Sequence, residues 1–98
     1  MKMQETIIKA MRRNRALEFT YEGQARVVNP HALYRESKRR KPILHAWQTE
    51  GKSETRVVPC WGNFHLDKIV DLAILDEEVM TRHPKFNPKR FKDIIHSI

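Results

Sequence analysis

The sequence has few of the residues on which several common classes of protein depend. One cysteine, Cys60, cannot form an internal disulfide, and none of the five histidines stands at zinc-site spacing with a cysteine partner. The three glycines are scattered along the chain, so no glycine-rich phosphate loop is present. We therefore expect no metal and no cofactor, and we predict that the protein has no catalytic residues and is not an enzyme.

Long apolar runs are also missing. No stretch reaches the length needed to cross a bilayer, and the N-terminus MKMQETIIKAMRRNR lacks the apolar run of a secretory signal peptide. A single cysteine suits a reducing compartment. We therefore expect a cytoplasmic protein with no membrane partner.

Positive charge is abundant. The 98 residues carry 19 lysines and arginines against 12 acidic residues, a formal net charge of +7. Such a balance favours an anionic partner, most often nucleic acid, although a basic surface can also serve solubility alone. One run without an apolar face holds five of these cations: Arg35, Lys38, Arg39, Arg40 and Lys41. We predict an exposed, mobile loop that attracts polyanions without sequence specificity.

The N-terminal segment, residues 1–15, has a helical pattern. Three apolar residues recur at helical spacing while lysine and arginine fall on the other faces: Ile7, Ile8 and Met11. We predict an amphipathic helix from about Gln4 to Asn14.

From residue 16 to residue 80 the apolar period becomes two, which is typical of half-buried strands. The clearest alternation is that of Leu17, Phe19 and Tyr21. Glu22-Gly23 then supplies a hairpin turn, and Pro30 marks a place where the returning strand bends or changes partner. About five short strands separated by turn signals predict a small β-barrel or curled sheet, and barrel closure would remove the exposed edges.

The tail, residues 81–98, has the signals of a short C-terminal helix. Asn87 is suited to cap it and Pro88 to its first position. The predicted fold class is thus mainly β with flanking helices (α+β), in a single domain of residues 1–98.

The segment GNFHLDKI, residues 62–69, contains a histidine and a lysine among large apolar residues. Strand alternation places Phe64 and Leu66 on one face and His65 on the other. A continued strand would bury Lys68, so we predict a turn at Asp67-Lys68. A turn at this corner accounts for the exposed Lys68 without any ligand. His65 can likewise be a surface residue in polar surroundings, with no ligand-binding role.

Three segments, in order and spacing, resemble the WYL domain: YEGQARVVNPHAL, ILHAWQTEG and FHLDKIVDLAIL. In that family an arginine precedes a proline, as Arg26 precedes Pro30, and a Phe-Arg-Leu-Asp-Arg-Ile-like segment follows. The last segment matches it at Phe64, Leu66, Asp67 and Ile69, with His65 and Lys68 at its two basic positions. The family's Trp-Tyr-Leu aligns with Pro42-Ile43-Leu44, where only Leu44 agrees.

The resemblance covers roughly residues 5 to 80 and implies a five-stranded SH3-like or Sm-like barrel. It further implies a bacterial ligand-sensing module, of the kind that accompanies transcription regulation or phage defence. The ligand-binding candidates that it implies are Arg26, His65 and Lys68, with Tyr21 and Trp47 as possible stacking surfaces. We predict a small anion site in which Arg26 and His65 share one face of the barrel and Lys68 stands at its rim.

Each of these residues also has a structural interpretation. Large aromatic residues such as Tyr21 and Trp47 usually belong to the core of a small domain. Arg26 can simply pair with Glu22 or Asp67, an exposed contact worth about 0–1 kcal/mol.

Two functions are consistent with the sequence. The first is a sensor that binds single-stranded nucleic acid or a nucleotide and acts with a DNA-binding or effector protein. The alternative is a protein–protein interaction module that docks an acidic partner or mediates self-assembly into a homo-oligomer.

Overall fold

The predicted N-terminal helix is present. In the computed structural model, which describes residues 2–51, 57–78 and 82–98, α1 runs from Lys2 to Arg13 and buries Ile7, Ala10 and Met11. The helix ends where Asn14 adopts a positive φ of 59°. No helix in these ranges is long and apolar enough to cross a membrane.

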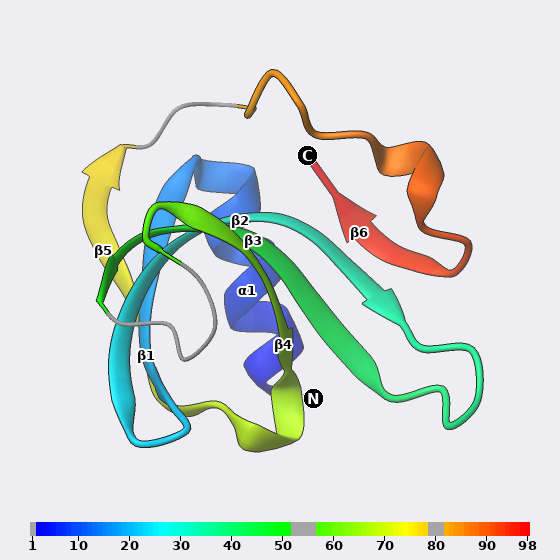
Figure 1. The fold of residues 1–98 in the computed structure, drawn as a ribbon, viewed down its shortest axis with the longest axis horizontal. Helices are drawn as coiled ribbons and strands as arrows, with labels where there is room; N and C mark the ends of the chain where they lie inside the picture. The colour runs from blue at the N-terminus through cyan, green and yellow to red at the C-terminus, as the bar shows by residue number, and fades with distance from the viewer. Residues whose placement is uncertain (1, 52–56, 79–81) are drawn as a thin grey trace.

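In the described part of the chain six strands form one antiparallel sheet. Its path is β4-β3-β2-β1-β5, and β6 pairs separately with β2 (Figure 1). The strands are β1 (Arg15–Tyr21), β2 (Gln24–Arg35), β3 (Pro42–Gly51), β4 (Cys60–His65), β5 (Val70–Glu78) and β6 (Ile94–Ser97).

The hairpin predicted between β1 and β2 is confirmed. Glu22 and Gly23 both have positive φ angles, 54° and 74°, as a tight two-residue turn requires. Pro30 also acts as predicted, because β2 pairs with β1 up to Val28 and with β6 from Ala32 onward. Register shifts against β3 flank this proline and bend the strand.

The mainly β fold is confirmed, but the five strands do not close into a barrel. Among the described strands, β4 and β5 are the two ends of the path and do not pair with each other. The chain between them is short: the 3₁₀ turn η1 (Leu66–Lys68) and Ile69. Such a link spans at most about 17 Å, so the sheet must curl strongly to bring its two edges this close.

The predicted C-terminal helix is wrong. Asn87 does cap a turn, since its Oδ1 accepts a hydrogen bond from the Lys89 N–H at 3.1 Å, but the turn is the short 3₁₀ helix η2 (Pro88–Arg90). The chain then extends into β6. The β-branched isoleucines at its end gain ladder hydrogen bonds with β2, and this pairing outweighs local helix signals.

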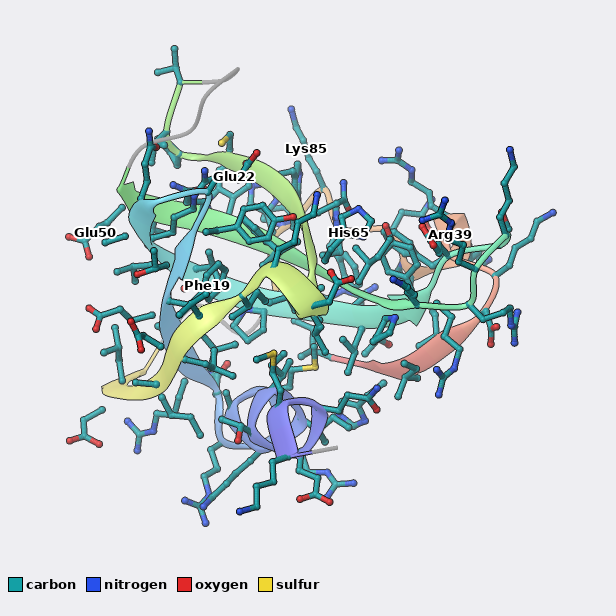
Figure 2. The ribbon with its side chains drawn as sticks, turned by 90° about the horizontal axis from the view of Figure 1, so that it is seen from below. Phe19, Glu22, Arg39, Glu50, His65 and Lys85 are labelled. Atoms are coloured by element: carbon teal, nitrogen blue, oxygen red, sulfur yellow. The ribbon has the colours of Figure 1, made fainter. Side chains whose placement is uncertain are left out.

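The middle of the sheet, formed by β2 and β3, is covered on both faces. The inner face packs on α1, which lies to one side of the sheet in Figure 2, and its core includes Phe19, Leu33, Leu44, Phe64 and Leu66. The outer face of β2, β3 and β4 is partly covered by residues 82–93, which we call the C-terminal arm. Aromatic rings and histidines, rather than aliphatic side chains, fill that second interface.

Gly51, the last residue of β3, gives a test of how tightly β3 packs against β2. Gly51 has a φ of 96°, and a Cβ there would collide with the carbonyl oxygen of Ala25 on β2. We expect Gly51→Ala to lower the free energy of unfolding by about 3 kcal/mol. Gly23→Ala is the matched control, because its φ of 74° is also unfavourable but nothing lies within 4 Å. It should cost only about 1 kcal/mol in urea unfolding followed by circular dichroism. Equal losses would show that the Ala25 contact does not constrain the strand.

Candidate functional site

The basic run forms the connection between β2 and β3. Residues Lys38, Arg39, Arg40 and Lys41 are exposed, whereas Arg35, at the end of β2, is half-buried. Two backbone hydrogen bonds close the loop, from the Glu36 N–H to Lys41 O at 3.0 Å and from the Arg40 N–H to Glu36 O at 3.1 Å.

The turn predicted at Asp67-Lys68 is confirmed as η1. Leu66 and Ile69 are buried on either side of it, while Asp67 and Lys68 are exposed. The buried pair fixes the corner to the core and holds the two polar residues outside. His65, the last residue of β4, stands opposite Ile43 in the ladder, close to the start of β3. The corner therefore lies beside the basic loop.

Together the loop and the corner enclose a hollow of about 240 Å³. We call it the basic cradle, and its lining residues are Glu36, Lys38, Arg39, Lys41, His65, Asp67 and Lys68. Four lysine and arginine charges against two carboxylates leave a net charge of +2 with the histidine neutral. In Figure 2, His65 and Arg39 lie toward the same end of the sheet, away from Glu22 and Glu50.

The acidic residues neutralise the cradle only in part. Lys41 Nζ lies 3.3 Å from Asp67 Oδ2, and both side chains are about half exposed (52% and 52%). Such an exposed pair is worth about 0–1 kcal/mol. Within the described residues, Lys38, Arg39 and Lys68 have no carboxylate at ion-pair distance. These three cations are available to an anionic ligand.

Arg26 is not part of the cradle. It points into the inner face beside Phe19, is 5% exposed, and holds its guanidinium carbon 5.3 Å from the Tyr21 ring centre and 5.7 Å from that of Phe64. One Nη lies 3.6 Å from Glu22 Oε1, while that Nη and the Nε have no hydrogen-bond partner. The sequence placed Arg26 and His65 on one face, but only His65 and Lys68 share the cradle.

Tyr21 connects these two regions. Its ring lies under Arg26, and its hydroxyl oxygen accepts the backbone N–H of His65 at 3.1 Å. Tyr21 is only 7% exposed, which fits its interpretation as a core residue better than that of a stacking surface. It therefore positions the corner from beneath.

Trp47 lies in a different part of the molecule. It is half-buried on the outer face, with its ring centre 4.3 Å from that of His83, beside a hollow of about 130 Å³. It lies six positions along the strand from Lys41, which corresponds to about 20 Å. The structure does not bring Trp47 to the cradle.

Sequence reasoning missed the polar, aromatic character of the outer face. His31 and His45 are buried there, and burial lowers the pKa of both imidazoles. Trp61 lies against both rings, stacked on His45 at 4.5 Å and edge-on to His31 at 5.0 Å. Strand alternation could have placed the two histidines on strands, but it could not have found the distant arm that covers them.

No group of three metal-ligating side chains gathers within the part of the chain that the structure describes.

Comparison with known families agrees with this architecture. The model of the WYL domain matches residues 2–74, most of the chain, so the protein belongs to the WYL domain family. WYL domains are associated with ligand-sensing regulatory proteins. No curated protein and no solved structure matches the chain. The match includes every residue that lines the cradle, and it ends before the C-terminal arm.

Proposed function

We propose that the protein is a non-enzymatic ligand-sensing module that binds nucleic acid or a nucleotide through the basic cradle, and that it serves bacterial transcription regulation or phage defence. The observation that carries this proposal is the convergence of two sequence-distant basic segments on one hollow. Membership of the WYL family supports the sensing role.

The side chains of the cradle suit a phosphate-bearing ligand. Arg39 presents a planar guanidinium that can hold a phosphate with two hydrogen bonds, while Lys38 and Lys68 act as point charges. Glu36 and Asp67 can accept hydrogen bonds from the amino groups of nucleobases. A mixed lining of this kind favours a nucleotide unit over a bare inorganic anion.

A direct binding measurement tests the proposal. A fluorescently labelled single-stranded oligonucleotide should show increased anisotropy with the protein, with affinity falling as salt rises. Unlabelled oligonucleotide and free nucleotides then compete, alongside polyglutamate at equal total charge. We expect the nucleic-acid competitors to displace the probe and polyglutamate to do so poorly. Equal displacement by polyglutamate, or no binding of the probe at low salt, would contradict the proposal.

A protein-interaction module is the second candidate. Among the described strands, β4 and β5 each have one edge without a strand partner, and such edges can pair with another chain. This alternative predicts that the mass in solution rises with protein concentration and does not depend on salt. Light scattering after size-exclusion chromatography measures this directly.

A further inference from the structure

The C-terminal arm is held on the outer face of the sheet by two phenylalanines. Phe86 is 6% exposed and lies with its ring centre 5.1 Å from that of His31. The ring centre of Phe91 lies 4.7 Å from that of Tyr34 and 4.8 Å from that of His45. Histidine rings thus form much of the surface on which the arm packs.

His31 is restricted to one protonation state by its two hydrogen bonds. The side chain is 1% exposed, and its Nδ1 lies 2.8 Å from the carbonyl oxygen of Asn29, so Nδ1 must carry a hydrogen. Its Nε2 accepts the backbone N–H of His83, on the arm, at 2.9 Å. Only the neutral imidazole with its proton on Nδ1 satisfies both partners.

A second imidazole also accepts a backbone hydrogen bond within the arm. The Nδ1 of His83 accepts the N–H of Lys85 at 3.0 Å. The first turn of the arm is therefore fixed by two hydrogen bonds that imidazole nitrogens accept, one on His31 and one on His83.

The surroundings of His31 also oppose its protonation. Burial is the largest cause that lowers its pKa below the ordinary value of 6.5, although its hydrogen bond to Asn29 acts in the opposite direction. The charged and titratable groups whose fields reach it are all basic: His45 on β3, and His83 and Arg82 on the arm. A positive charge on His31 would thus be repelled by these basic groups, and water would not reach it to solvate it.

His45 packs against Phe91 at the far end of the arm, and its surroundings also oppose its protonation. Its Nδ1 lies 2.9 Å from Asn63 Oδ1, which also accepts the Tyr34 hydroxyl at 3.1 Å. Burial lowers the pKa of His45 most, the hydrogen bond to Asn63 raises it, and Arg90 on the arm lowers it further. Protonation here would place a second cation beneath a basic segment.

We propose that residues 82–91 are a proton-operated latch, held on the outer face by neutral His31 and released when His31 is protonated. Release uncovers Trp47, Trp61 and His45, while β6 keeps the tail attached to β2. The released state binds more protons than the docked state. Docking is therefore strongest above pH 6.5 and weakens as the pH falls through 6.5 toward the lowered pKa of His31.

The two tryptophans of the chain, Trp47 and Trp61, both contact the arm and report its position. Their emission is followed from about pH 8 to about pH 5, together with far-ultraviolet circular dichroism. We expect the emission of the wild-type protein to shift to the red with a midpoint below 6.5, while the circular dichroism stays constant. A flat emission, or a shift that coincides with loss of the circular dichroism signal, would overturn the proposal.

Three variants test whether His31 and the docked arm cause the pH-dependent change in emission. His31→Gln keeps a neutral acceptor for the His83 N–H and should abolish the pH transition, with the emission staying at its high-pH position. His96→Gln, on β6, is the matched control and should keep the wild-type midpoint. Phe86→Ala should show the released emission already at pH 8 with unchanged circular dichroism, which tests the latch even if the His31 variant does not fold. An unaltered transition in His31→Gln, or a docked emission in Phe86→Ala, would contradict the latch.

Discussion

Truncation of Phe64 to alanine should lower the free energy of unfolding by about 3–5 kcal/mol, the largest stability effect that we expect from a single substitution. Phe64 is 2% exposed and meets Phe19 and Tyr21 edge to face, each with ring centres 5.1 Å apart. Its removal would leave a cavity between the curled strands. It would also remove one of the two aromatic faces beneath the buried guanidinium of Arg26.

Phe91→Ala is the matched control for this prediction. Phe91 is half-buried and packs on the outer face, against Tyr34 and His45. Because its loss affects the arm rather than the inner core, we expect a cost of about 1–2 kcal/mol. Urea unfolding of both variants at pH 8 separates them. A cost for Phe64→Ala no larger than that for Phe91→Ala would show that the aromatic cluster does not hold the sheet together.

Neutralisation of the three unpaired cations of the cradle should have the largest effect on binding. We expect the triple variant Lys38→Gln, Arg39→Gln, Lys68→Gln to bind a single-stranded oligonucleotide at least about 10-fold more weakly at low salt. The slope of log affinity against log salt should fall by about 2, since each phosphate contact on a single strand contributes about 0.7. The side chains are exposed, so the melting temperature should hardly change.

A control variant removes the same charge elsewhere. Lys9, Arg12 and Arg13 are exposed on α1 around a separate hollow of about 390 Å³. Their replacement by glutamine should leave the oligonucleotide affinity and its salt slope close to those of the wild type. Equal weakening by both triple variants would mean that net charge, and not the cradle, attracts the ligand.

The local features of the fold were predictable because they depend on neighbouring residues. The spacing of Ile7 and Met11 gives α1, the alternation of Phe19 and Tyr21 gives β1, and Glu22-Gly23 gives the hairpin. The corner at Asp67-Lys68 followed from the cost of burying a lysine. Each of these features is determined by residues close to it in the sequence.

The features that were missed depend on distant partners. The tail, expected as a helix, forms β6 because β2 extends beyond β1 and offers it a free edge. Arg26 is buried because Tyr21 and Phe64 supply aromatic faces, and Phe64 comes from a strand 38 positions away. Both halves of the cradle were visible in the sequence, but their proximity arises from the pairing of Ile43 with His65.

The cradle itself is tested most directly by nuclear magnetic resonance of the ¹⁵N-labelled protein titrated with an unlabelled single-stranded oligonucleotide at pH 7.5 and low salt. We predict that the backbone amides with the largest shift changes are those of residues 36–41 and 65–68, the two segments that enclose the hollow. Saturating changes confined to α1 or to the outer edge of β5, with the cradle amides unmoved, would contradict this prediction.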